Sequence, residues 1–221
     1  MYSINMIYII ITTSINNRWG VINRARRKNR YIECIKSLLG LIKDNNNLHP
    51  IIVENNGDRN TFLNSLDCDV IYTNNNKINR GHKGTNELLD IKHVINKYNI
   101  HDNDTIIKLT GRYKITNLDF INLVIDNCDT TDAFVKFFNV CTKQYHYNRD
   151  DCVLGLFAIK CRYLKNFKYQ YKKSPECEFA IYVKGNVKKL KAIENLGLEC
   201  CFADNLRLLK VWDVERVKMT V

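Results

Sequence analysis

Short apolar runs alternate with helix-like patterns through the first half of the chain. Runs rich in β-branched residues are typical of buried strands, and they occur at 7–11, 50–53, 69–73 and 105–109. Between these runs, apolar residues recur every three or four positions from Tyr31 to Ile42 and from Leu88 to Tyr98. That spacing predicts amphipathic helices, and strands alternating with helices favour a mostly parallel sheet that is covered on both faces.

The pattern changes after Tyr113. Apolar spacing predicts a helix from Leu118 to Cys128, and Ser174-Pro175 predicts the start of another that runs to Val183. Ser is suited to the N-cap of that helix and Pro to its first position. Because fewer helices separate the strands here, we expect an antiparallel or mixed extension of the sheet. The predicted strands of this half are 133–140, 153–159, 198–203 and 209–217, the last two as edge or loosely packed segments.

Length and charge limit the number of domains and the kinds of partner that the protein can have. With 221 residues, the chain can bury a large core, and we expect a single α/β domain over 1–221. The net charge of +11 attracts anions, whether nucleic acid, an acidic membrane or a phosphorylated small molecule. Apart from the cluster from Arg24 to Arg30, Lys and Arg are scattered, and no nucleic-acid-binding module is recognisable. We therefore expect no specific nucleic-acid partner.

The cysteines and the first apolar run indicate the compartment. None of the nine cysteines forms a Cys-x-x-Cys pair, and no zinc-binding spacing with His is present. Scattered cysteines in apolar runs favour reduced thiols in a cytosol-like compartment. The run from Met6 to Ile11 is too short to span a bilayer and lacks the features of a signal peptide. The sequence therefore predicts a soluble cytoplasmic protein with no transmembrane segment.

Polar residues follow the predicted strands at their carboxyl ends. In open α/β sheets this edge binds ligands, so these segments together predict a pocket. They are Thr12–Ser14, Glu54–Gly57, Asn74–Asn76 and Thr110–Arg112. The sequence has no Gly-x-Gly-x-x-Gly, P-loop or Gly-x-Ser-x-Gly motif, which argues against a dinucleotide-binding Rossmann site, a P-loop hydrolase and an α/β-hydrolase.

The order of these parts resembles a known family. The pieces are Ile9-Ile-Ile-Thr-Thr-Ser14, Arg30-Tyr-Ile-Glu-Cys-Ile-Lys-Ser-Leu38, Val53-Glu-Asn-Asn-Gly57, Lys83-Gly-Thr-Asn-Glu87, Ile107-Lys-Leu-Thr-Gly-Arg-Tyr113, Gly155-Leu-Phe-Ala158 and Ser174-Pro-Glu-Cys-Glu-Phe179. Over almost the whole chain, this order resembles the GT-A-type nucleotide-sugar glycosyltransferases. Within them it is similar to a small single-domain group found in viral and bacterial glycan gene sets.

The resemblance implies a fold, an activity and partners. It implies a GT-A-like (Rossmann-like) fold with a nucleotide-sugar donor half to about residue 113 and an acceptor half after it. The expected activity is transfer of a hexose or deoxyhexose from a nucleoside diphosphate sugar to a hydroxyl of a glycan or glycoprotein. If the protein is viral, the host cytosol or a viral factory is its expected location.

The strand that ends at Thr110 departs from the family pattern. Where the family normally has Asp-x-Asp, whose carboxylates hold a divalent cation, this chain has Thr110-Gly111-Arg112. A guanidinium supplies fixed positive charge with bidentate geometry, so we expect Arg112 to replace the metal in part. Manganese or magnesium is left open as a cofactor. Asp102-Asn103-Asp104 precedes the strand, so we expect turn chemistry at the opposite edge of the sheet.

The resemblance also implies roles for particular residues. The expected nucleotide-sugar contacts are Thr12, Thr13, Ser14, Arg30, Glu54, Asn55, Asn75, Arg80, Lys83, Gly84, Gly111 and Arg112, with Arg27 as a further phosphate contact. For the base that deprotonates the acceptor, the candidates are Glu176 and Glu178, with Glu176 preferred. The expected acceptor contacts are Gly155, Phe157 and Tyr145. Each of these residues also has a purely structural explanation. The polar and charged ones can belong to an ordinary loop, a charged surface or a helix cap, and Phe157 can belong to the core.

Two other functions remain open from the sequence. A catalytically inactive module that binds sugar nucleotide or glycan would also lack the metal motif. A basic nucleic-acid-binding protein would use the positive charge directly, and its affinity would depend steeply on salt.

Overall fold

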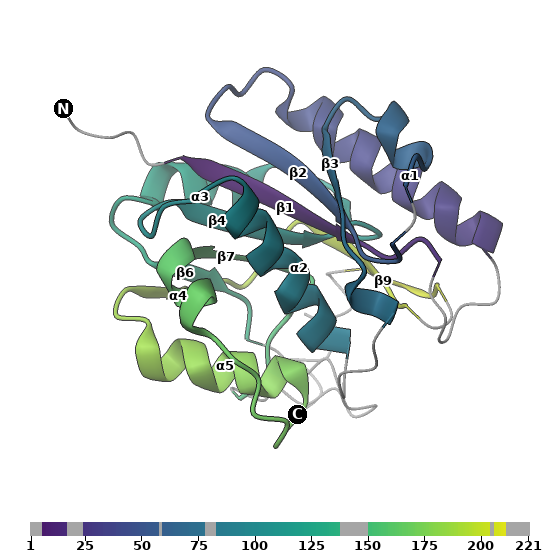
Figure 1. The fold of residues 1–221 in the computed structure, drawn as a ribbon. Helices are drawn as coiled ribbons and strands as arrows, with labels where there is room; N and C mark the ends of the chain where they lie inside the picture. Colours follow the sequence, from purple (N-terminus) through teal and green to yellow (C-terminus); the bar gives the residue numbers. More distant parts are fainter. Residues whose placement is uncertain are drawn as a thin grey trace.

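The computed structural model describes residues 6–16, 24–57, 59–77, 83–137, 150–203 and 206–210. A seven-stranded sheet forms the centre, with the strand order β3-β2-β1-β4-β7-β6-β8 (Figure 1). Its strands are β1 (Ile7–Thr13), β2 (Leu48–Glu54), β3 (Asp69–Tyr72), β4 (Thr105–Thr110), β6 (Ala133–Val135), β7 (Leu156–Lys160) and β8 (Leu190–Ala192).

Most strand pairs of this sheet are parallel. β1 pairs in parallel with both β2 and β4, and β2 pairs in parallel with β3. The later strand β7 is antiparallel to β4 and to β6, while β8 is parallel to β6. The expectation of a mixed, mostly parallel sheet flanked by helices in an α/β fold is confirmed.

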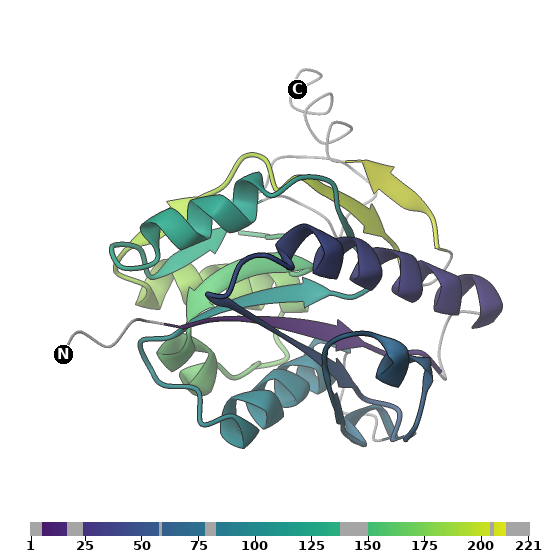
Figure 2. The same ribbon diagram turned by 90° about the horizontal axis from the view of Figure 1, so that it is seen from above.

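Helices cover both faces of the sheet (Figure 2). One face carries α1 (Arg24–Ile42) and α3 (Asp119–Asn127), and the other carries α2 (Lys83–Lys97), α4 (Cys161–Asn166) and α5 (Pro175–Asn186). Successive residues of β1 divide between the two cores: Ile9 and Ile11 pack under α1, whereas Ile10 packs under α2. This division follows from the two-residue period of a strand.

A second, three-stranded sheet lies on the side of α1 and α3 (Figure 2). It is antiparallel, with the order β10-β9-β5, and consists of β5 (Lys114–Ile115), β9 (Leu198–Cys201) and β10 (Leu208–Lys210). Two short 3₁₀ helices, η1 (Phe62–Ser65) and η2 (Asn75–Lys77), flank β3. The predicted strand at 209–217 lies largely outside the described residues.

Helix α1 begins seven residues before the predicted start, at Arg24 instead of Tyr31. The sequence pattern missed its first turns because their buried positions are arginines. Arg27 and Arg30 are buried and continue the helical spacing of Tyr31, Cys34 and Ile35 toward the amino end. Part of the basic cluster is therefore not surface charge.

The second half differs from the prediction in its short elements. Strand β6 covers only the first part of 133–140, whose last residues lie outside the description, and β7 begins at Leu156 instead of 153. The short elements α4, β5 and β8 had no sequence signal long enough to predict them. The predicted cap of α5 is confirmed, because Ser174 Oγ accepts a hydrogen bond from Cys177 N. None of the helices in the described ranges has the length and hydrophobicity of a membrane span.

Candidate functional site

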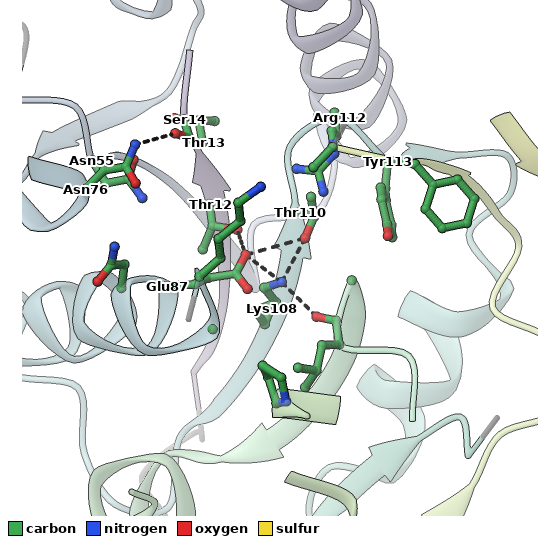
Figure 3. A pocket seen from close by; sticks show the side chains of 18 of the residues that line it. Thr12, Thr13, Ser14, Asn55, Asn76, Glu87, Lys108, Thr110, Arg112 and Tyr113 are labelled. Carbon is green, nitrogen blue, oxygen red and sulfur yellow. Dashed lines mark hydrogen bonds and ion pairs between the residues drawn. The ribbon is translucent and has the colours of Figure 1, made fainter. Parts of the chain in front are cut away.

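A cavity of about 540 Å³ lies at the carboxyl ends of β1, β2 and β4 (Figure 3). The segment before β7 and the first residues of α2 and α5 complete its wall. It is lined by Thr12, Thr13, Ser14, Arg27, Tyr31, Asn55, Asn76, Lys83, Gly84, Asn86, Glu87, Lys108, Thr110, Arg112, Tyr113, Val153, Leu154, Gly155, Pro175, Glu176, Phe202 and Ala203. The structure thus brings the predicted polar strand ends together in one site.

Many predicted site residues line this cavity. They are Thr12, Thr13, Ser14, Asn55, Lys83, Gly84, Arg112, Gly155 and Glu176, together with Arg27. Arg30, Glu54, Asn75, Gly111, Phe157 and Glu178 do not line it, for reasons that differ from residue to residue. Arg80 and Tyr145 lie outside the described residues.

Two glycines let the elements around the cavity approach closely. Gly111 N donates to Thr12 O at 2.9 Å, which ties the end of β4 to the end of β1. A Cβ atom at Gly111 would lie 2.9 Å from Thr13 Cγ2, and one at Gly155 would overlap the ring of Tyr113. Gly111 therefore shapes the cavity without lining it, whereas Gly155 admits the Tyr113 ring to the wall.

Lys108 and Glu87 form an ion pair in the wall of the cavity (Figure 3). Lys108 Nζ lies 2.8 Å from Glu87 Oε1 and donates to Thr110 Oγ1 at 2.8 Å and to Leu154 O at 2.7 Å. Thr12 Oγ1 donates to the same Glu87 oxygen at 2.5 Å. The pair therefore connects β1, β4, α2 and the segment before β7.

Burial and charge act in opposite directions on this pair. Burial by itself raises the pKa of Glu87, but the Lys108 ammonium and the hydrogen bonds from Lys108 and Thr12 outweigh it, and the pKa is lowered. Burial lowers the pKa of Lys108, and the Glu87 carboxylate opposes that shift. Glu87 is therefore ionised at neutral pH and is a weak proton acceptor.

Neither member of this ion pair was predicted from the sequence. The available signal was Lys108 itself, a lysine inside the apolar run of β4 where every residue is buried. A lysine in such a strand is almost never fully buried without a partner. The apolar spacing placed Glu87 at the start of the helix α2, but it does not show that Glu87 is the partner of Lys108.

The Arg112 side chain is held by Cys201 and Tyr31 at the other side of the cavity. Its Nε donates to Cys201 O at 2.7 Å, and its guanidinium carbon lies 5.5 Å from the centre of the Tyr113 ring. Within the described ranges, no carboxylate lies within ion-pair distance of Arg112. The Cys201 carbonyl and a hydrogen bond with the Tyr31 side chain thus hold the guanidinium, while no carboxylate neutralises its charge directly.

The two buried arginines of α1 differ in position. Arg30 pairs with Glu199 at 2.7 Å, and its Nε donates to Arg112 O at 2.9 Å, so it supports the Arg112 turn from behind. The expectation that Arg30 contacts the ligand is corrected for this reason. Arg27 lines the cavity, and its Nε donates to Ser14 O at 2.8 Å.

Glu54 supports the loop after β1 instead of lining the cavity. Its carboxylate is completely buried and accepts hydrogen bonds from Thr13 Oγ1 at 2.7 Å, Ile15 N at 3.1 Å and Asn56 Nδ2 at 2.6 Å. Burial raises its pKa, and these hydrogen bonds oppose the shift. We expected Glu54 beside the base or ribose, and this expectation is corrected because its oxygens are used within the protein.

Asp90 of α2 has a similar supporting role behind the amide side chains. It accepts hydrogen bonds from Asn55 Nδ2 at 2.9 Å, Thr73 Oγ1 at 2.6 Å and Asn75 Nδ2 at 2.7 Å. Burial raises the pKa of Asp90 to about 6, against the effect of these bonds. Asn75 therefore points to Asp90, and its neighbour Asn76 lines the cavity in its place.

Glu176 and Glu178 have opposite environments in the first turn of α5. Glu178 accepts hydrogen bonds from the backbone N–H groups of Gln170, Lys172 and Lys173 at 2.6, 2.5 and 3.1 Å, so its carboxylate organises that loop. Glu176 is half-buried on the cavity wall, and no hydrogen bond or ion pair to its carboxylate occurs among the described residues. Of the two candidates, Glu176 lines the cavity and Glu178 does not.

Phe157 belongs to the core and not to the acceptor side of the cavity. It is 3 % exposed, and its ring centre lies 4.6 Å from that of Phe179 in α5. The expectation that it stacks on a sugar is corrected, because its side chain points to the α5 side of the sheet. The neighbouring Gly155 does line the cavity.

The strand end does not fit a metal held by a carboxylate pair. The described residues contain no group of three or more His, Cys, Asp or Glu side chains arranged to hold a metal ion. Asp102 pairs with Lys165 at 2.6 Å, and Asp104 accepts from His101 N at 2.8 Å. Both precede β4, whereas the cavity lies beyond its other end, so they form a turn at the opposite edge as expected.

Comparison of the sequence with family models and with curated proteins gives no match. Comparison with solved structures gives several. A protein from Desulfovibrio desulfuricans G20 assigned as a nucleotide-diphospho-sugar transferase aligns with a TM-score of 0.54 and 7% identity, covering 86% of this chain and 80% of that one. The mannosyltransferase PcManGT from Pyrobaculum calidifontis, solved with GDP-Man and Mn²⁺, aligns with a TM-score of 0.52 and 8% identity over 86% of this chain and 55% of its own.

A third similar structure has a different activity. It is a 4-diphosphocytidyl-2C-methyl-D-erythritol synthase, with a TM-score of 0.52, 10% identity, and coverage of 97% of this chain and 98% of that one. At these identities the likeness concerns the fold. The chain therefore has the GT-A-like, Rossmann-like fold that nucleotide-sugar transferases and nucleotidyltransferases share.

Proposed function

We propose that the protein is a glycosyltransferase that uses a nucleoside diphosphate sugar. The observation that carries this proposal is the charge of the cavity at the carboxyl ends of the parallel strands. Four cationic side chains, Arg27, Lys83, Lys108 and Arg112, line it together with the two carboxylates Glu87 and Glu176. The excess of positive charge suits a diphosphate, whose negative charge grows on the leaving group as the glycosidic bond breaks.

The cavity wall offers different chemistry at different places. Ser14, Asn55 and Asn76 form a polar group after the ends of β1, β2 and β3, which suits the base and ribose of a nucleotide (Figure 3). Arg112 lies at the end of β4, where we place the diphosphate. Glu176 enters from α5 and is the group that we assign as the base for the acceptor hydroxyl.

Arg112 is our proposed partial substitute for a metal ion. The end of β4 has no carboxylate pair, and the Arg112 guanidinium is fixed by Cys201 O without a carboxylate neutralising it directly. A fixed guanidinium can bind two phosphate oxygens and stabilise the leaving group. Strict dependence of turnover on manganese would contradict this role.

The remaining assignments concern the acceptor and the organisation of the chain. We propose a hydroxyl of a glycan or glycoprotein as the acceptor, and a hexose or deoxyhexose as the transferred sugar. Residues up to about 113 form the donor half, and those from 114 to 221 form the acceptor half of a single domain. Gly155 and Glu176 are the acceptor-side residues that line the cavity.

A thermal-shift screen of UDP-, GDP- and dTDP-sugars, each with EDTA or manganese, tests donor binding. A ligand that binds only the folded protein raises its melting temperature. We expect at least one of these donors to raise it in EDTA, and Arg112→Met to reduce the rise. Absence of any shift with all three donor classes, in both EDTA and manganese, would contradict the proposal.

Product analysis separates the proposal from its alternatives. A glycosyltransferase releases a nucleoside diphosphate from the donor, whereas a nucleotidyltransferase of the same fold releases pyrophosphate from a nucleoside triphosphate. A binding module without catalysis would show the thermal shift with neither product. A nucleic-acid-binding protein would instead bind arbitrary DNA or RNA with an affinity that falls steeply with salt.

A further inference from the structure

The two carboxylate oxygens of Glu87 have different surroundings. Oε1 is 2.8 Å from Lys108 Nζ and accepts from Thr12 Oγ1 at 2.5 Å and from Thr110 Oγ1 at 3.5 Å. Oε2 accepts no hydrogen bond from any described residue, and the Glu87 side chain is 28% exposed on the cavity wall. One oxygen therefore joins the strands, and the other is open to a ligand.

Lys108 has no donor left for a ligand. An ammonium group has three N–H donors, and those of Lys108 are used by Glu87 Oε1, Thr110 Oγ1 and Leu154 O. Its side chain is only 1% exposed. Its charge therefore acts through Glu87, which it neutralises and holds in one orientation.

The open oxygen suits a neutral donor group. A phosphate would be repelled by the Glu87 carboxylate, and a second carboxylate would be repelled for the same reason. A hydroxyl can donate to Oε2 and leave Oε1 undisturbed. Glu87 lies between the group of Ser14, Asn55 and Asn76 on one side and Arg112 on the other (Figure 3). This central position fits the sugar of the donor better than its base.

We propose that Glu87 Oε2 accepts a hydrogen bond from one hydroxyl of the donor sugar and so determines which sugars the cavity takes. Lys108 is the positioning residue of this interaction. The inference rests on the proposed function, because it assigns a subsite of the same cavity. The proton stays on the sugar hydroxyl, and no covalent bond changes at Glu87.

The test is calorimetry with Glu87→Gln. In this variant the amide carbonyl can replace Oε1 beside Lys108, which turns the amide NH₂ toward the cavity and converts an acceptor into a donor. The probes are UDP, GDP and dTDP, and the matching UDP-glucose, GDP-mannose and dTDP-rhamnose. We expect affinity for the nucleoside diphosphate to be unchanged, and the affinity for its sugar conjugate to fall at least about tenfold.

A second set of ligands identifies the hydroxyl. In deoxyfluoro analogues of the bound donor sugar, fluorine takes the place of one hydroxyl and cannot donate a hydrogen bond. We expect one substituted position to weaken binding to the wild type by about tenfold. The same substitution should have no further effect on Glu87→Gln, because its hydrogen-bond acceptor is already missing.

Two variants control for indirect effects. Asp102→Asn removes a carboxylate from another ion pair, with Lys165 at 2.6 Å, at the opposite edge of the sheet from the cavity, and should leave every affinity unchanged. If Glu87→Gln does not fold, the double variant Glu87→Leu/Lys108→Met removes both charges and avoids an unpaired buried ammonium. It also lacks the carboxylate acceptor, so the same loss of sugar affinity is expected.

The outcomes separate this inference from the function on which it rests. Equal weakening of the nucleoside diphosphate and its sugar conjugate, or equal affinity for all deoxyfluoro analogues, would overturn the role of Glu87 alone. Failure of the wild type to bind any of the sugar nucleotides would remove the proposed function itself. Loss of sugar affinity with intact nucleotide affinity supports both.

Discussion

The carboxylates around the cavity fall into two groups with different surroundings. Glu87 and Glu176, which line the cavity, form the wall carboxylates, and each has an oxygen without a hydrogen bond or ion pair among the described residues. Glu54, Asp90 and Glu178 form the supporting carboxylates, which lie behind the wall. The difference shows that an acidic residue near a site is a candidate for chemistry only if neighbouring donors leave an oxygen open.

The supporting carboxylates all accept several hydrogen bonds from short loops. Glu54 holds the segments after β1 and β2, Asp90 holds three polar side chains around α2, and Glu178 holds the backbone before α5. Such contacts compensate the cost of burying a charge and fix the loops that carry the cavity wall. Substitutions in the two groups should therefore affect different measurements.

The largest expected effect is on turnover, with Glu176→Gln. If Glu176 removes the proton of the acceptor hydroxyl, its replacement should lower the transfer rate by about 10²–10⁴-fold while the melting temperature stays unchanged. Product formation at saturating donor and acceptor measures this effect. Full activity in Glu176→Gln would place Glu176 among the residues that are not needed for chemistry.

The second-largest expected effect is a loss of affinity for the sugar-nucleotide donor in Arg112→Met. Removing a charged hydrogen-bond donor from the diphosphate should weaken donor binding by about ten- to a hundredfold. Manganese should not restore the affinity, because the end of β4 has no carboxylate pair to bind it. Titration calorimetry measures the change, and recovery by manganese would show that a metal site exists there.

Replacing a supporting carboxylate, as in Glu178→Gln, should lower the stability of the protein and not its turnover or donor affinity. Glutamine keeps one acceptor oxygen but replaces the other with an NH₂ donor and removes the charge, so the free energy of unfolding should fall by about 1–3 kcal/mol. Although burial opposes the shift, the hydrogen bonds from backbone N–H groups lower the pKa of Glu178. Its contribution is therefore present above its ordinary pKa and is lost as the pH falls through the lowered value. Urea denaturation at neutral and acidic pH measures both effects, and retained transfer activity separates Glu178 from Glu176.

The stability contributed by Asp90 should depend on pH in the opposite direction from that of Glu178, and the change should be smaller. Burial raises its pKa to about 6, so the native protein binds the proton more readily than the unfolded chain does. Its contribution to stability is complete below the ordinary Asp pKa and is lost as the pH rises toward 6. The stability of the wild type relative to Asp90→Asn should therefore decrease as the pH rises from about 4 to 6. A difference that is independent of pH would contradict the raised pKa.

The fold and the edge of the sheet that carries the cavity were predicted from the sequence. The hydrogen bonds and ion pairs between side chains were not. Apolar runs and helical spacing were sufficient for β1, β2, β4 and α2, and Ser174-Pro175 indicated the start of α5. They failed at the start of α1, where Arg27 and Arg30 take buried positions that the pattern assigns to apolar residues. Short elements such as α4 and β8 carry too few residues for any period to appear.

The site residues that were predicted wrongly have hydrogen-bond or ion-pair partners that the sequence does not reveal. Glu54 and Asn75 follow the expected strands, but their side chains turn to donors and acceptors inside the protein. Lys108 and Glu87 are 21 residues apart in sequence, and their contact arises only when α2 packs on the sheet beside β4. No local pattern encodes such a contact, although a lysine within an apolar strand indicates that a partner must exist.

The most direct test of the account is the release of nucleoside diphosphate from UDP-, GDP- and dTDP-sugars by the wild type in EDTA. We expect release from at least one donor, and a much slower release by Glu176→Gln when an acceptor glycan is present. Absence of release from every donor, with or without manganese and an acceptor glycan, would contradict the claim that this cavity catalyses sugar transfer.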